Sequence, residues 1–144
     1  MSTCASQVLV QGPQCNVIEV ITAGPQGLPG PSIGFSLSVS DTPSGMINDY
    51  APTGYVPGVT NKLCLTPSAA LTLTGIVAPT TDGFPLYLLN LSATFSISFS
   101  HETGSVVTNQ FMCPSGVSLV LTPLTGAILV YDFTSGFWTF GGVG

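Results

Sequence analysis

Residues 94–100, TFSISFS, alternate strictly between polar and apolar side chains, and this alternation decides the fold class. Phe95, Ile97 and Phe99 would lie on one face of a strand, with the intervening serines on the other. A period of two residues is typical of a β-strand with one buried face. The stretch therefore predicts a half-buried β-strand.

Runs of the same kind extend in both directions from this strand. FPLYLLNLS, residues 84–92, is denser in apolar residues and predicts a central strand covered on both faces. Turn signals such as HETGS and TSG separate the runs roughly every 8–12 residues. With 12 prolines, 17 glycines and no stretch of period 3.6, helices are disfavoured. The pattern favours an all-β domain, either an antiparallel sandwich or a barrel. The other runs are KLCLT, ALTLTGIV, VVTNQFMC, VSLVLTP, AILVYDF and FWTF.

The chain divides into four segments by composition. Residues 1–23 form an N-terminal attachment arm, 24–34 a collagen-like neck, 35–61 an extended connector and 62–144 the β-domain. In the connector, Leu37 and Val39 alternate with serines, and three turn signals follow. We expect Tyr50 and Tyr55 to anchor this otherwise irregular connector.

The arm contains two short β-prone runs, SQVLV and NVIEVIT, separated by a turn signal. A segment this short cannot bury a core of its own. We therefore expect it to pair with the main domain, a sister chain or another protein. The residues expected to make this attachment are Val8, Val10, Val17, Ile18, Val20 and Ile21.

The neck, GPQGLPGPS, reads as three Gly-X-Y triplets beginning at Gly24, Gly27 and Gly30, and the frame breaks at Ile33. A collagen helix needs three chains, because only glycine fits at the shared axis. Three triplets are too few to offset the backbone entropy by themselves, so a neighbouring trimeric domain would have to hold the chains together. The alternative is a single-chain polyproline II spacer.

Charge is scarce: the chain has one lysine, no arginine and six carboxylates, for a net charge of −5. An ordinary domain has about a quarter of its residues charged. The pattern fits either a low-charge β-protein or a subunit covered by copies of itself or by a larger assembly. The lack of cations argues against nucleic-acid binding and against anionic membranes. No apolar run is long enough for membrane insertion, and MSTCASQVLV lacks the basic start of a signal peptide, so we expect cytoplasmic synthesis.

The cysteines show no metal-binding spacing, and reduced thiols are expected in the cytoplasm. Cys64 and Cys113 lie in apolar runs and are expected in the core. Cys4 and Cys15 lie in the arm. The alternative to reduced thiols there is a disulfide between two chains, and the sequence does not decide between them.

Candidate catalytic residues are few, and no metal, cofactor or enzymatic activity is expected. His101 lies in a turn and is expected to be solvated, and the carboxylates, Glu102 and Asp132 among them, show no paired spacing. The aromatic cluster around Trp138 and Tyr131 is interpreted as core or interface packing. The alternative is a sugar-stacking surface made by these two rings.

Two stretches of the chain resemble virion appendage proteins of tailed bacteriophages. Residues 17–34 resemble the opening of fibre proteins in which a GPQGPxG tract joins an attachment segment to a trimeric β-domain. Residues 70–140 resemble a β-domain of phage head-fibre, decoration and tail-fibre proteins. The residues that carry this second resemblance are Leu88, Asn90, Asn109, Phe111, Pro114, Gly116, Leu121, Pro123, Tyr131, Asp132, Ser135 and Trp138.

The resemblance implies a jelly-roll-like sandwich, a homotrimer and a place on the virion exterior, on the capsid or the tail. It implies a non-enzymatic capsid decoration (cement) or head-fibre subunit whose arm binds the major capsid protein or another virion protein. The alternative is a short tail fibre or receptor-binding spike that contacts a host-surface glycan.

Overall fold

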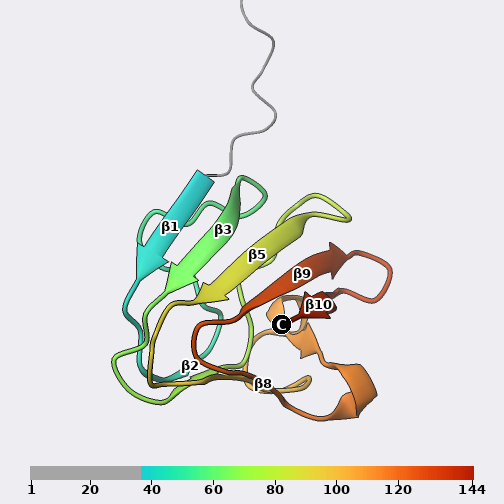
Figure 1. Ribbon diagram of the computed structural model, residues 1–144. Coiled ribbons are helices and arrows are strands. Elements are labelled where there is room, and N and C mark those ends of the chain that lie inside the picture. The colour runs from blue at the N-terminus through green and yellow to red at the C-terminus, as the bar shows by residue number, and fades with distance from the viewer. Residues whose placement is uncertain (1–36) are drawn as a thin grey trace, which may run out of the picture. The chain divides into compact units, whose positions relative to one another are not determined.

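The computed structural model describes residues 37–144, whose strands form two sheets (Figure 1). Within this range the only helical pieces are two short 3-10 turns, at Val107–Asn109 and Pro114–Gly116. The expected all-β class is therefore confirmed. The six-stranded sheet has the order β1 (Leu37–Asp41), β3 (Thr60–Leu65), β5 (Pro85–Asn90), β9 (Gly126–Asp132), β10 (Phe137–Val143) and β7 (Phe111–Met112). The four-stranded sheet has the order β2 (Gly45–Ile47), β4 (Leu71–Leu73), β6 (Ile97–Phe99) and β8 (Leu119–Leu121).

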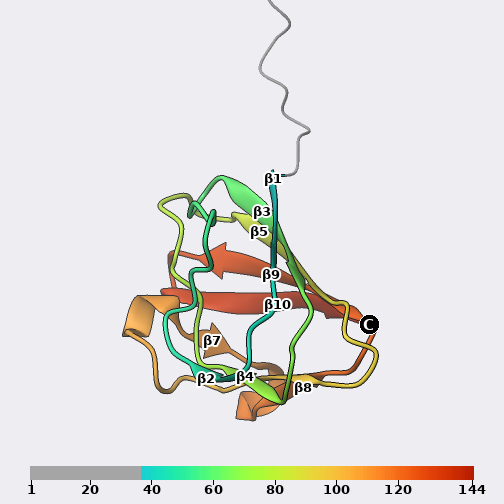
Figure 2. The same cartoon turned by 90° about the vertical axis from the view of Figure 1, so that its left-hand side faces the viewer.

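The first six strands alternate between the two sheets and form a β-solenoid. β1, β3 and β5 pair in parallel in the large sheet, while β2, β4 and β6 pair in parallel in the small one. Val39 pairs with Leu63, which pairs with Leu88. Each coil therefore takes about 25 residues, within the period range of solenoid proteins. Figure 2 shows β2, β4 and β8 together on the side of the unit away from β1 and β3.

Proline corners stack where the chain leaves the large sheet. Thr42-Pro43-Ser44 follows β1 and Thr66-Pro67-Ser68 follows β3, with both prolines buried. The N–H of Thr66 donates to the carbonyl of Asp41 at 2.9 Å, and that of Ser68 to the carbonyl of Pro43 at 3.2 Å. Proline suits such a corner because its fixed φ turns the chain and it needs no hydrogen-bond acceptor. Identical corners in successive coils keep the strands in register.

The last three strands close the unit in antiparallel fashion. β8 pairs with β6, β9 pairs with β5, and β10 pairs with β9 through the turn that follows Asp132. The Asp132 carboxylate accepts hydrogen bonds from the N–H groups of Thr134 and Ser135, and Gly136 adopts a φ of 79°. Aspartate and glycine are the residues that this kind of tight turn favours.

The core lies between the two sheets and consists of the inward-facing residues of both. Alternation along each strand directs every second side chain into this layer. Full burial of each leucine or phenylalanine contributes about 1.5–3 kcal/mol relative to an exposed position. The largest fully buried side chains are Trp138, Phe99, Phe111, Leu63, Leu65, Leu71, Leu73, Ile76, Leu86, Leu88, Ile97 and Leu121.

The expected antiparallel, jelly-roll-like order is wrong for the first half of the unit. Alternation indicates only that one strand face is buried, and both a solenoid and a sandwich satisfy that requirement. Parallel neighbours need a crossover of a dozen or more residues. Here the strands of the small sheet, with their loops, serve as those crossovers.

The stretch predicted as a connector contributes to the same folded unit as the β-domain. Residues 36–144 form one compact unit, and residues 35–61 supply β1, β2 and the start of β3 to it. Tyr50 and Tyr55 are buried, as expected of anchors. The Tyr50 hydroxyl donates to Asp41 at 2.6 Å, and the Tyr55 hydroxyl donates to the carbonyl of Val77 at 2.9 Å.

Candidate functional site

The predicted neck and arm residues lie outside the described part of the chain. This applies to Gly24, Gly27 and Gly30 of the neck and to the arm residues Val8, Val10, Val17, Ile18, Val20 and Ile21, together with Cys4 and Cys15. The site is therefore built from residues 37–144.

The predicted aromatic pair lies in the core. Trp138 is 0% exposed and Tyr131 is 3% exposed, and their rings meet edge to face at 5.3 Å. Trp138 Nε1–H donates to the carbonyl of Ile76 at 2.8 Å, and the Tyr131 hydroxyl donates to that of Thr108 at 2.8 Å. Burial, assisted by the negative charge of Asp132, raises the pKa of Tyr131. Buried rings cannot stack on a sugar, so the structure favours the packing interpretation.

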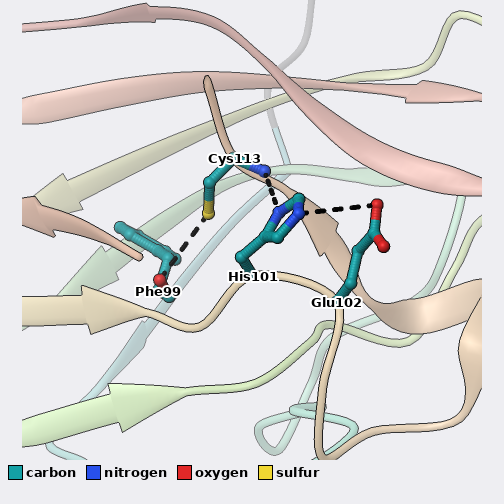
Figure 3. A network of polar contacts seen from close by, with 4 residues as sticks. All are labelled: Phe99, His101, Glu102 and Cys113. Carbon is teal, nitrogen blue, oxygen red and sulfur yellow. Dashed lines mark hydrogen bonds and ion pairs between the residues drawn. The ribbon is translucent and has the colours of Figure 1, made fainter. Parts of the chain in front are cut away.

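His101 is half-buried and bonded rather than solvated in a turn. The backbone N–H of Cys113 donates to its Nδ1 at 3.1 Å, and its Nε2 lies 3.7 Å from Glu102 Oε2 (Figure 3). Because Nδ1 accepts a hydrogen bond, the neutral ring carries its proton on Nε2, facing the carboxylate. The ring therefore ties the segment after β6 to the segment after β7.

The Cys113 thiol does not form a nucleophile–base pair with this histidine. Its sulfur is directed toward the carbonyl of Phe99, to which the thiol donates at 3.6 Å, and not toward the imidazole (Figure 3). Burial raises the pKa of this thiol, which favours the unreactive protonated form. Cys113 is a core residue, as expected, whereas Cys64 is only half-buried.

Residues 37–144 contain neither a metal-binding cluster nor a membrane-spanning helix. In the described part of the chain, no three His, Cys, Asp or Glu side chains are grouped so that they could hold a metal ion. None of the helical segments described for residues 37–144 has the length and apolar character of a membrane span.

Asn90, one of the residues that carry the resemblance, is a structural joint. It is fully buried at the end of β5, and its Nδ2 donates to the carbonyls of Phe95 at 2.9 Å and Thr122 at 3.1 Å. Its Oδ1 accepts from the N–H of Ser92 at 3.1 Å. The amide therefore satisfies backbone groups of two loops that have no strand partners there.

Asn109, another of these residues, forms a second joint with Asp49. Asn109 Nδ2 donates to Asp49 Oδ1 at 2.8 Å, and Asn109 Oδ1 accepts from the N–H of Ala78 at 2.8 Å. Asp49 Oδ1 also accepts from the N–H of Val106 at 2.9 Å. These contacts join three loops. Asn90 and Asn109, two of the residues that carry the resemblance, therefore stabilise the fold.

The outer surface of the large sheet carries a row of apolar side chains on adjacent strands. Outward-facing side chains follow each other across the sheet in register: Lys62 pairs with Tyr87, which pairs with Ile128. Tyr87 is 45% exposed and Ile128 is 39% exposed. We call this surface the outer face, and it consists of Lys62, Cys64, Tyr87, Leu89, Ile128 and Val130.

The outer face differs from the matching surface of the small sheet. There the outward positions of β4 and β6 are Thr72 and Ser98, flanked by the exposed Met46 and Val120. In the large sheet, all outward positions of β5 and the middle of β9 are apolar. β5 is a central strand, as predicted, but among residues 37–144 side chains cover only its inner face. PLYLLN carries apolar residues at both parities, which is the pattern from which a cover on both faces was predicted.

The chain matches no family model, and no curated protein or solved structure is similar to it. Its function is therefore inferred from its own residues. The relevant features are the hydrogen bonds of Asn90 and Asn109, the outer face, and the glycine triplets that precede β1 in the sequence.

Proposed function

We propose that this protein is a non-enzymatic structural virion protein of a bacteriophage, a homotrimeric capsid decoration (cement) or head-fibre subunit. The observation that carries the proposal is the position of the Gly-X-Y triplets. The last triplet ends at Ser32, and the two-sheet unit begins at Ser36. A triple-helical tract needs a trimeric domain directly beside it, and the proposed trimer of this unit meets that requirement.

The short link between triplets and sheet constrains the trimer. Residues 33–36 can span at most about 14 Å when fully extended. If three chains run side by side through the triplets, their β1 strands must begin close to the common axis. The compact unit would then cap the neck directly, as a short spike and not as a long fibre.

The arm supplies attachment in this proposal. Val17, Ile18, Val20 and Ile21 form a β-prone run that can add as a strand to a sheet of the major capsid protein or another virion protein. A trimer presents three such arms, so weak single contacts combine into stable binding. A site of local three-fold symmetry on the capsid would match this arrangement.

No observation favours the alternative of a glycan-binding spike. The rings that would have carried it, Trp138 and Tyr131, are buried and have internal hydrogen-bond partners. The side chains with catalytic potential also have structural roles, because His101 and Asp132 both bond to backbone groups.

Deletion of residues 1–23 tests the attachment step. The full chain should cosediment with phage particles that lack their own copy of the protein, and the deleted chain should not. Trp138 emission and the number of chains per assembly should be the same for the full and the deleted chain, since the compact unit is unchanged. Particle binding that survives the deletion would refute anchoring by the arm.

A further inference from the structure

We propose that the outer face of the large sheet is the surface through which copies of this chain pack around the trimer axis. This inference rests on the trimer of the proposed function and names the surface that would form it. The face spans β3, β5 and β9, and its centre consists of Tyr87, Leu89 and Ile128. An exposed apolar patch on successive strands indicates a binding surface.

The composition of the face suits a protein interface. Tyrosine is enriched in interface centres because its ring buries a large area while its hydroxyl keeps a polar contact. Tyr87 and Ile128 face each other across β5 and β9, and Leu89 lies two residues further along β5. Half-buried Val130 extends the apolar surface along β9.

The shape of the face allows another sheet to approach closely. On one side, β1 presents only Ser38 and Ser40, which pair with Lys62 and Cys64. On the other side, Gly142 of β10 pairs with Ile128. The serines on one flank and the glycine beside Ile128 on the other leave Tyr87 and Ile128 prominent at the centre of the face, whereas the larger Phe137 pairs with Asp132 at its far end. Such a surface can interdigitate with apolar side chains from neighbouring copies.

The position of the neck indicates that the partner that covers the outer face is another copy of this chain. The 36 residues before β1 enter the unit at Leu37, which is 43% exposed, and β1 flanks the outer face. Triplets that hold three chains together would therefore bring three β1 strands close to one axis. The outer face is the broad apolar surface next to that strand.

The charges favour contact at this face as well. Every copy carries a net charge of −5, so copies repel each other wherever their carboxylates meet. Of the described carboxylates, only Asp132 points outward from the large sheet, at the far end of β9, while Lys62 lies within the face. Lys62 forms no ion pair with any residue from 37 to 144. Copies that meet over Tyr87, Leu89 and Ile128 keep the Asp132 carboxylates at the end of the contact and not at its centre.

Cys64 provides a native probe of the face. It is half-buried beside Leu89, whereas Cys113 is buried in the core. In a full chain with Cys4→Ser and Cys15→Ser, a maleimide would thus report mainly on Cys64. We expect a trimer by light scattering and slow labelling of Cys64. Tyr87→Glu should speed labelling by about tenfold or more, because a buried carboxylate opposes packing.

Ile128→Glu provides a second disruption at the same face, and Met46→Glu is the matched control. Met46 is 73% exposed on the outer surface of the small sheet, so its substitution should change neither the mass nor the labelling rate. Trp138 emission identifies the variants that remain folded, because this ring is fully buried.

The outcomes separate this inference from the proposed function. A wild-type trimer in which Cys64 labels as fast as in both face variants would overturn the inference while leaving the trimer intact. A monomeric wild-type chain would refute both. A monomer with a protected Cys64 would point to the chain's own residues 1–36 as the cover and would also overturn the inference.

Discussion

At the scale of single residues, the side chains of Asn90, Asn109 and Asp49 connect loops that make no strand pairs. The Asn90 amide satisfies carbonyl groups of the β5–β6 loop and of the β8–β9 turn, and Asn109 holds the loop that contains Asp49. Such groups are costly to leave unsatisfied in a dry interior, where an unpaired polar group loses water without replacement. These residues therefore contribute to stability rather than to chemistry.

Replacing Asn90 by alanine should destabilise the unit by about 2–4 kcal/mol, because the substitution leaves several buried carbonyls without a donor. Urea unfolding followed by Trp138 fluorescence measures the change. Asn48 is the control: it is exposed and accepts one hydrogen bond from Thr74 at 2.7 Å. Asn48→Ala should cost less than about 1 kcal/mol. Equal losses at the two positions would contradict the role given to Asn90.

Asp132 should make stability depend on pH. Hydrogen bonds, first from Ser135 and then from Thr134, lower the pKa of its carboxyl below the ordinary value of 3.8. The contribution is present above pH 3.8, where the unfolded chain is ionised too, and it is lost as pH falls through the lower folded value. Asp132→Asn should therefore be less stable than wild type near neutral pH. The difference should shrink in acid, as urea unfolding at several pH values would show, and a constant difference would exclude this linkage.

At the scale of elements, three coils stack because their inward residues repeat, and the first two coils also share Thr-Pro-Ser corners. Ile47, Leu73 and Phe99 lie at equivalent positions in the small sheet, as do Val39, Leu63 and Leu88 in the large one. The chain comes very close to itself at Gly75, beside β4. This glycine has no room for a side chain, because a Cβ there would collide with the carbonyl of Asn109 and lie 2.6 Å from Ser105 Oγ.

Gly75→Ala should cost about 3 kcal/mol or more, because the main obstacle is backbone that cannot move aside. Thermal unfolding is a sufficient measurement. Gly144→Ala is the control, since a Cβ at that position meets nothing within 4 Å and the backbone is not in the left-handed region. A stable Gly75→Ala variant would mean that the loop around Asn109 lies elsewhere.

The strands could be predicted from alternation, but their direction could not. The inward positions Ile97 and Phe99 follow directly from TFSISFS. Parallel pairing depends on where distant segments meet, and the repeated Thr-Pro-Ser corners at residues 42–44 and 66–68 were the available signal. The outer face could not be predicted either, because sequence parity does not reveal which strand face lacks a cover. For Trp138 the sequence allowed two interpretations, core or interface packing and a sugar-stacking surface, and the structure agrees with the first.

At the scale of the whole molecule, the proposal combines three features into one assembly. In this proposal the triplets hold three chains, the outer face packs them, and the arms attach the trimer to a virion. Each feature alone has another explanation, but a collagen-like tract requires three chains, and the outer face and the arms are compatible with that number. The scarcity of charge fits as well, because a surface that is covered in the assembly needs few solvated charges.

The molar mass of the full chain in solution tests this central claim most directly. Light scattering coupled to size exclusion, over a wide range of protein concentration, should give about three times the chain mass of 14.7 kDa. Three chains are required because the collagen helix has three strands. A mass that stays at 14.7 kDa at every concentration, or that doubles to a dimer, would contradict the account.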